Sequence, residues 1–494
     1  MSLKSTTQSF LQLVSSKLIV QFIQVLTVPI VLRFYLPNDY GKVALYSSIF
    51  SVYMIFIGFT ETAKIRFSRE EFEKTGKFTK SYWGTLLLRI PFIILALISV
   101  YLNAQKILTY TSLSPSILWV IYISIISSAI TGSTQFLFSL EKFKLGAIIN
   151  LLRSLIRILF IVLLITKLLA PTPIVLILFT LISTKSIDII VLFFIKNKIG
   201  QPEIDWAWTK DMISFSLPFL LIIAGGLTVD YIDAIIIKRY MTFSDLGVYS
   251  VAYKLYSFGI VPFVIINTVV TPRVISIFNA QKIDSLKRFY KKILPQVYFF
   301  INQLLLIFIV FSPLLIYFVG QRYYDSIPVI AVLFGSLSWF PLIYLNEAYF
   351  VASKRTKGIL LSNVSMAVIN IALDIILVQK IGIMGAAVGT FVARFVAFGI
   401  SAIYMYKNLR ISNIYLIFIN IPIIFSTTLI ITDIPFPYTV SIMIILSTVS
   451  WFFAYKIRMF NNESLIFFRN IGMPHTVEKY FVWFYKKLIH HEEN

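Results

Sequence analysis

The chain has 494 residues, of which 58% are hydrophobic and 13% are charged, whereas soluble domains carry about 25% charged residues. This composition excludes a soluble globular protein and predicts an integral membrane protein. The absence of cysteine excludes disulfides, thiolate metal sites and cysteine nucleophiles. The net charge of +22 is typical of basic cytoplasmic loops in a membrane protein, so we assign no nucleic-acid partner.

Apolar segments long enough to span a bilayer, about 20 residues each, recur along the chain. We predict an all-α polytopic protein with about fourteen spans, at 10–35, 43–60, 82–102, 117–139, 145–166, 172–195, 212–237, 246–270, 294–319, 327–352, 360–378, 385–406, 413–432 and 437–455. Most Lys and Arg residues outside the spans then fall on the side that holds both termini. The positive-inside rule therefore predicts cytoplasmic termini.

The first two groups of six spans resemble each other. The turn RFYLPNDYG at Arg33–Gly41 and the turn RYMTFSDLG at Arg239–Gly247 share Arg, Asp and Gly at one offset, 206 residues. Transporters are often built from such repeats, with the substrate site between them. We predict a six-helix lobe at 1–200, a second at 201–410, two extra spans at 411–455 and a cytoplasmic tail at 456–494.

The tail contains VEKYFVWFYKKL at 477–488, which mixes aromatic residues with lysines. This pattern predicts an amphipathic helix that lies on the inner leaflet. All three histidines, His475, His490 and His491, lie in the tail, which excludes a histidine metal or base centre inside the membrane.

Cationic residues lie inside several apolar segments, where a charge is costly and usually faces a bundle interior or an aqueous cavity. They are Lys17, Arg89, Arg153, Arg157, Lys185, Lys254 and Arg394. Arg153 and Arg157 are one helical turn apart and share a face, from which they could grip a diphosphate. Snorkelling and internal pairing are the alternatives for this pair, and snorkelling is the alternative for Lys17. The other cations either line the same anion pathway or pair with Asp188, Asp230 or Glu347.

Carboxylates in the spans are candidates for ion coupling. Asp230 and Asp233 share a helix face, and their repulsion could create a H⁺ or Na⁺ site unless they pair with Lys238 or Arg239. Lys185 and Asp188 form either an intrahelical ion pair or a coupling site, and Glu347 is a further candidate. We predict no metal and no organic cofactor.

Helix-weakening residues occur in three predicted spans, at Pro29, Gly225–Gly226 and Pro262. Such residues loosen the backbone hydrogen-bond ladder and permit bending, although they are also frequent in ordinary membrane helices. We predict hinges at these positions.

Four stretches resemble the polysaccharide-export branch of the multidrug/oligosaccharidyl-lipid/polysaccharide exporter superfamily, and the Wzx-type O-antigen flippases in particular. They are LPNDYGKVA at 36–44, IGFTETAKIRF at 57–67, FSLP at 215–218 with Asp230 and GVYSVAYK at 247–254, and NIALDIILVQKIGIMGAAVG at 370–389. The resemblance implies a MATE-like fold of two six-helix lobes and alternating access. The extra pair of spans departs from the twelve that are usual in the family and also occurs in lipid II flippases.

The substrate that the resemblance implies is an undecaprenyl-diphosphate-linked oligosaccharide, moved across a bacterial inner membrane. Implied partners are membrane lipids, a polysaccharide polymerase and chain-length proteins. A multidrug antiporter of the same fold should favour acidic groups in its cavity, which the basic excess argues against. A polymerase or ligase should have one long external loop, which is absent here, and a scaffold without transport leaves the buried cations unexplained. We predict a transporter and no enzymatic activity.

Overall fold

The structure is a computed structural model of the chain. It describes residues 20, 23–24, 26–130, 137, 142–279, 281–353, 355, 357–411, 414–432, 434–457, 459–462, 465 and 475–489. Helices are the only regular secondary structure in these residues. The chain divides into two compact units, Met1–Ser250 and Val251–Asn494. The predicted lobe boundary near residue 200 stays a prediction.

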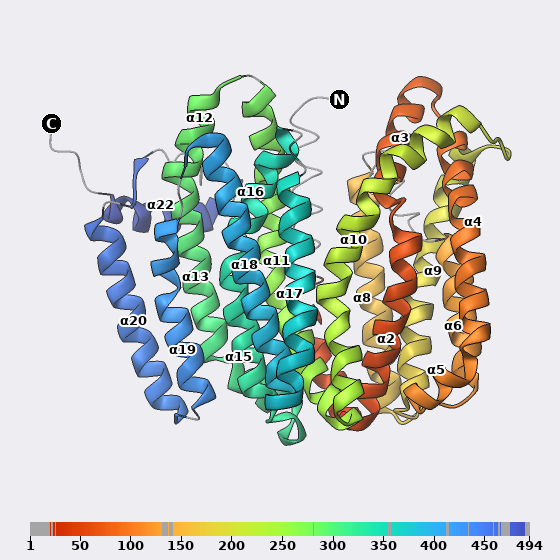
Figure 1. The fold of residues 1–494 in the computed structure, drawn as a ribbon, viewed down its shortest axis with the longest axis horizontal. Helices are drawn as coiled ribbons and strands as arrows, with labels where there is room; N and C mark the ends of the chain where they lie inside the picture. The colour runs from red at the N-terminus through yellow and green to blue at the C-terminus, as the bar shows by residue number, and fades with distance from the viewer. Residues whose placement is uncertain are drawn as a thin grey trace. The chain divides into compact units, whose positions relative to one another are not determined.

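The first unit begins with helical residues between 20 and 34 and continues through an antiparallel set of long helices (Figure 1). They are α2 (Pro37–Gly58), α3 (Glu61–Thr75), α4 (Thr79–Leu102), α5 (Ala104–Thr111), α6 (Ser116–Ser127), η1 (Ser128–Ile130), α8 (Phe143–Ile165), α9 (Pro173–Ile199) and α10 (Trp206–Tyr240). The next helix, α11 (Phe243–Asn279), begins in the first unit and ends in the second.

The second unit contains the remaining helices. They are α12 (Ile283–Arg288), η2 (Phe289–Ile293), α13 (Leu294–Val310), α14 (Ser312–Val319), η3 (Gln321–Tyr323), α15 (Ser326–Ser336), η4 (Leu337–Trp339), α16 (Phe340–Ala352), α17 (Lys357–Ile381), α18 (Ile383–Leu409), η5 (Ile414–Asn420), α19 (Ile421–Ile431), α20 (Phe436–Lys456) and α22 (His475–Leu488). The tail helix α22 covers the segment that the sequence predicts to be amphipathic.

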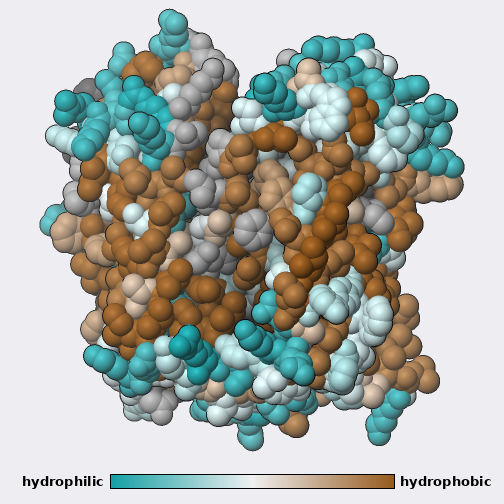
Figure 2. Space-filling model, turned by 45° about the vertical axis from the view of Figure 1, so that its right-hand side comes forward, coloured by the Kyte–Doolittle hydropathy of each residue, from teal (hydrophilic) through white to brown (hydrophobic). Residues whose placement is uncertain are grey.

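The predicted spans coincide with helices wherever the structure describes them. Among the described residues, eight helical segments are long and apolar enough to cross a membrane, and α5 with α6, bent by 114°, makes a ninth candidate. The other predicted segments fall on residues 20–34, α2, α10, α11 and η5–α19. On the face drawn in Figure 2, hydrophobic side chains form a broad band with hydrophilic side chains gathered at its two ends. This is the pattern of a protein that spans a bilayer.

The stretch 196–211 between the sixth and seventh predicted spans is partly helical in the structure, because α9 continues to Ile199 and α10 begins at Trp206. Asp205 caps α10 by accepting from the Trp208 N–H at 3.0 Å and also accepts from Lys80 Nζ at 2.8 Å. Buried Glu71 in turn accepts from the N–H groups at the start of α4, those of Lys80 and Ser81, both at 2.8 Å. These contacts fasten α10 to α3 and α4 within the first unit.

The two repeated turns pack against each other within the first unit. A side chain added at Gly41 would overlap the Phe243 carbonyl, and one added at Gly247 would overlap the Pro37 carbonyl. Phe243 lies 206 residues after Pro37, the same offset as between the two glycines, so the contact is reciprocal. Two repeats related by a twofold axis would make such a reciprocal contact. Glycine is required at both positions because the two backbones approach too closely to leave room for a Cβ atom.

Close backbone contact also shapes the second unit. Side chains added at Gly385 or Gly389 would overlap Leu377 or Asp374, so glycine lets α18 lie directly on α17. The two extra spans pack on α13, where Tyr298 donates to Asn420 at 2.7 Å and Ser447 donates to Gln303 at 2.8 Å.

The helices that carry the predicted hinge residues are continuous. Pro29 lies in the helical stretch 26–34, and α10 continues through Gly225 and Gly226. The helix α11 continues through Pro262, whose side chain lies outside the described residues. Bending at these positions therefore stays a prediction.

Candidate functional site

Arg89 lies at the centre of a group of charged side chains in the first unit. It is fully buried on α4, and its Nε donates to Thr60 Oγ1 at 2.9 Å. One terminal nitrogen donates to the Ser128 carbonyl at 3.2 Å, and the other forms an ion pair with Glu61. With all three nitrogens engaged, Arg89 holds together α4, the start of α3 and η1.

Glu61 is shared between two cations. Besides Arg89, it contacts Lys64, whose Nζ donates to the Glu61 oxygens at 3.1 and 3.2 Å. Lys64 is 1% exposed. A buried lysine is costly unless it is paired, and Glu61 supplies that partner one helical turn away.

Helix α9 adds Lys185 and Asp188. Lys185 Nζ donates to the Ser127 carbonyl at 3.2 Å, beside the Ser128 carbonyl that Arg89 uses. Asp188 is 6% exposed, and the charges that act on it most strongly are those of Lys185 and Arg153. The structure therefore brings together the α9 residues and Arg89 that the sequence singles out.

Helix α8 contributes the predicted diphosphate pair. Arg153 and Arg157 are both half-buried and act on each other electrostatically. The Nε of Arg153 is buried and has no hydrogen-bond partner among the described residues. Arg153 therefore has a buried donor that a bound acceptor could satisfy.

We call Glu61, Lys64, Arg89, Arg153, Arg157, Lys185 and Asp188 the N-terminal charge cluster. It holds five cations and two carboxylates, which leaves a positive excess inside apolar helices. Such an excess is costly in a membrane protein unless water or an anion compensates it. The cluster is thus chemically suited to an anionic ligand.

Two of the other predicted cations, Arg394 and Lys254, belong to the second unit. Arg394 is 1% exposed on α18, donates to Ser336 Oγ at 2.7 Å and lies 5.0 Å from the ring centroids of both Tyr256 and Phe340. These contacts fix its guanidinium inside the second unit. Lys254 is exposed on α11, and Lys17 lies outside the described residues.

The other predicted coupling carboxylates are on α10 and α16. Asp233, on α10, is buried and accepts a hydrogen bond from the Tyr249 hydroxyl of α11. The side chain of Asp230 lies outside the described part of the structure. Glu347 is half-buried on α16.

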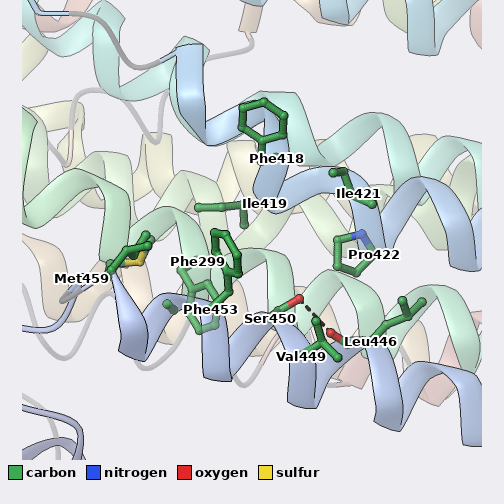
Figure 3. A pocket seen from close by; sticks show the side chains of 12 residues that line it. Phe299, Phe418, Ile419, Ile421, Pro422, Leu446, Val449, Ser450, Phe453 and Met459 are labelled. Atoms are coloured by element: carbon green, nitrogen blue, oxygen red, sulfur yellow. Dashed lines mark hydrogen bonds between the residues drawn. The ribbon is translucent and has the colours of Figure 1, made fainter.

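An apolar groove lies in the second unit between α13, η5–α19 and α20. It has a volume of about 580 Å³, and its lining includes Phe299, Phe418, Pro422, Val449 and Phe453. Figure 3 shows side chains of α19 and α20 facing each other across it. Its polar lining residue, Ser450, donates its hydroxyl to the Leu446 carbonyl at 2.8 Å, so the surface offers little to a polar ligand.

Sequence reasoning missed three charged residues of the structure, Glu61, Lys64 and Asp374. Glu61 and Lys64 were treated as the end of a span and its loop, although the ExxK spacing at one helical turn was a usable signal. Asp374 is fully buried on α17 and accepts a hydrogen bond from the Asn370 side chain, which also contacts Thr390 of α18. Among the described residues no group of three or more His, Asp or Glu side chains could hold a metal ion.

The solved structures most useful for comparison share this fold at low sequence identity. A lipid II flippase, MurJ, in an inward closed conformation is 17% identical with a TM-score of 0.64, covering 90% of this chain and 98% of its own. An inward-facing multidrug resistance MATE family transporter of the MOP superfamily is 14% identical with a TM-score of 0.63, covering 79% and 94%. A Vibrio cholerae MATE transporter, VcmN, is 16% identical with a TM-score of 0.56, covering 83% and 98%. No curated protein matches.

These likenesses define a multi-pass membrane protein with the MATE-like fold. A family model described as "Polysaccharide biosynthesis protein" matches residues 6–278, and the chain belongs to this family. The resemblance to the polysaccharide-export branch of the exporter superfamily is thereby confirmed.

Proposed function

We propose that the protein is a flippase that moves an undecaprenyl-diphosphate-linked oligosaccharide, an O-antigen or capsule repeat unit, across the bacterial inner membrane by alternating access. The observation that carries this proposal is the positive excess of the N-terminal charge cluster. The cluster has five cations and two carboxylates, so it has excess positive charge, and the buried Nε of Arg153 has no hydrogen-bond partner among the described residues. A diphosphate supplies both the compensating negative charge and acceptor oxygens for this donor. Family membership supports a substrate from polysaccharide biosynthesis.

Within the cluster, the proposal gives different tasks to different cations. Arg89 and Lys64 are already paired with Glu61, so they shape the site. Arg153 and Arg157 are the proposed diphosphate ligands, because they share a face and Arg153 retains an unsatisfied donor. Asp188 lies near both sets and is the proposed coupling carboxylate, for which H⁺ and Na⁺ remain the two candidate ions.

The groove of the second unit suits the isoprenoid part of the same substrate. Its lining is nearly all aliphatic and aromatic, so a polyprenyl chain could bind there by burying apolar surface. We propose that the head group travels through the protein while the chain stays in the groove or the bilayer.

Complementation tests the proposal. A strain that lacks its own repeat-unit flippase receives the wild-type gene, the Arg153→Gln/Arg157→Gln variant or the Lys196→Gln/Lys198→Gln variant, at matched membrane levels. The last variant removes the same charge at the end of α9, outside the cluster. Wild type and control should restore surface polysaccharide, and the arginine variant should not.

Three results would redirect the proposal. Full rescue by the arginine variant would make those arginines structural. Rescue of a strain depleted of its lipid II flippase, without rescue in any repeat-unit background, would identify lipid II as the substrate. Drug resistance without either rescue would favour the multidrug antiporter.

A further inference from the structure

The tail helix α22 packs on the other helices of the second unit through a buried tyrosine. Tyr485 is fully buried, and its hydroxyl donates to the Gln296 side chain of α13. Its ring lies 5.8 Å from that of Phe460 and 6.3 Å from that of Phe300. A fully buried tyrosine with its hydroxyl satisfied indicates a specific docking position for this helix.

The residues that hold α22 lie where apolar helix segments meet charged residues. Gln296 lies just after Lys291 and Lys292, beyond which α13 has no charged residue. Trp451, whose ring lies 5.6 Å from that of Phe484, is in the last turns of α20, which ends at Lys456. Figure 1 shows α22 beside the end of α20. The change from apolar to charged residues marks the level where the hydrocarbon core gives way to lipid head groups, so α22 lies at the interfacial level.

The side of α22 that is not docked combines aromatic and cationic residues. Tyr480 is 68% exposed and Trp483 is 59% exposed, although large aromatic side chains favour burial. Lys479, Lys486 and Lys487 are exposed on the same helix, and Lys487 Nζ lies 4.0 Å from the Trp483 ring. Exposed Trp and Tyr favour the head-group region, and clustered lysines favour anionic lipids there.

We propose that the exposed face of α22, formed by Lys479, Tyr480, Trp483, Lys486 and Lys487, binds the head groups of anionic phospholipids. The docked position holds this face at the interfacial level, so the surface is preformed. Charge complementarity selects acidic lipids over zwitterionic ones, and the aromatic rings enter the head-group layer. The proposal concerns a lipid contact of the protein's own tail and does not depend on which substrate is carried.

The absence of cysteine makes a single-label test direct. An Ile489→Cys variant of the full chain, labelled with an environment-sensitive dye just beyond α22, is purified in neutral detergent. It is titrated with short-chain phosphatidylglycerol and, separately, with short-chain phosphatidylcholine, and dye emission reports binding. We expect the apparent affinity for phosphatidylglycerol to be about tenfold higher or more.

Two charge-removal variants in the same background locate the effect. Lys479→Gln/Lys486→Gln/Lys487→Gln should bring the two affinities within about twofold, because the proposed contacts are electrostatic. Lys282→Gln/Lys287→Gln/Lys291→Gln removes the same charge around α12, within the same unit, and should leave the preference unchanged. Equal affinities in the unsubstituted protein, or a preference that survives loss of the α22 lysines, would overturn the proposal.

Discussion

Two kinds of arginine lie within the N-terminal charge cluster, and they differ in how completely they are bonded. Arg89 is fully buried with all three guanidinium nitrogens engaged, whereas Arg153 has a buried Nε without a partner among the described residues. A fully bonded arginine maintains structure, and an incompletely bonded one is available to a ligand. Position along the sequence does not distinguish the two, since both lie inside apolar segments.

Replacing Arg89 should therefore cost stability. Arg89→Gln removes a fully buried guanidinium that is bonded to Glu61, Thr60 and the Ser128 carbonyl, and breaking a buried ion pair costs about 3–5 kcal/mol. We expect a clearly lower thermal unfolding midpoint for the purified protein in detergent. Arg157→Gln should shift the midpoint little, because it removes a cation that is only half-buried beside a like charge. Equal midpoints for the two variants would contradict this division of roles.

At the membrane boundary, Asp205 links stability to pH. The hydrogen bond from Lys80 holds the pKa of Asp205 below its usual value, which is about 3.9 in model peptides. A carboxyl whose pKa is lower in the folded state stabilises the fold above the unfolded-state value, and this contribution is lost as pH falls through the folded-state value. Asp205→Asn should therefore lower the unfolding midpoint at pH 7, and the gap to wild type should narrow towards pH 3. If the difference in unfolding midpoint between Asp205→Asn and wild type did not change with pH, the contact between Lys80 and Asp205 would be excluded as its cause.

The sequence anticipates the cluster only in part. Arg89, Arg153, Arg157, Lys185 and Asp188 are visible because charges stand out in apolar segments, and the structure brings them together. Glu61 and Lys64 were missed because they lie where a span becomes a polar helix, so their charges look like ordinary loop charges. Lys254 and Arg394 belong to the second unit, and their predicted roles, lining the same anion pathway or pairing with a carboxylate, stay predictions. Pairing between distant helices depends on packing, which cannot be read from one sequence.

At the scale of elements, the glycine contact between α2 and α11 carries a sharp prediction. Gly41→Ala and Gly247→Ala each place a methyl group against a backbone carbonyl that has no freedom to rotate away. Overpacking of this kind costs about 1–3 kcal/mol, so both variants should unfold at lower temperature.

Gly58→Ala is the matched control, because this glycine is in α2 as well and has nothing within 4 Å of an added Cβ. Alanine is a better helix former than glycine, so the control should be neutral or slightly stabilised. If all three variants behaved alike, the close approach of α2 and α11 would be wrong.

The presence of the helices was easier to predict from the sequence than the residues at which they begin and end. The apolar segments matched helices because about 20 apolar residues can satisfy backbone polar groups in lipid only as a helix. The prediction missed that α9, α10 and α11 continue well beyond their apolar parts, since polar ends are stabilised by caps and contacts such as Asp205 with Lys80. The helix α3 was also missed, because its charged sequence looks like a loop.

At the scale of the whole molecule, the proposed function predicts that the apolar groove contributes to transport. Val449→Trp would fill part of the groove from α20, and Ile445→Trp, one turn away, is its control. Val449 is 55% exposed and lines the groove, whereas Ile445 is 60% exposed and does not. We expect the first variant to slow repeat-unit translocation several-fold at unchanged protein level, and the second to be close to wild type. Equal rates would show that the polyprenyl chain does not use the groove.

At this scale the sequence predicts the fold more completely than it predicts the substrate. The apolar spans predicted a polytopic membrane protein, the family resemblance implied the MATE-like fold, and the fold likenesses and the family match confirm both. The substrate is not fixed by the fold, because structures titled as a lipid II flippase and as multidrug transporters share it. The charge balance of the site is the physical feature that separates these substrates, and it depends on which charges the helices bring together.

The most direct measurement is translocation by the purified protein in liposomes. A labelled undecaprenyl-diphosphate oligosaccharide is placed in both leaflets, and the fraction of head groups that a membrane-impermeant reagent can modify is followed over time. Wild type and Lys196→Gln/Lys198→Gln should make nearly all head groups accessible, and Arg153→Gln/Arg157→Gln should leave about half protected, as in protein-free liposomes. Protection of half the head groups with wild type, under imposed H⁺ and Na⁺ gradients of either direction, would contradict the proposed function.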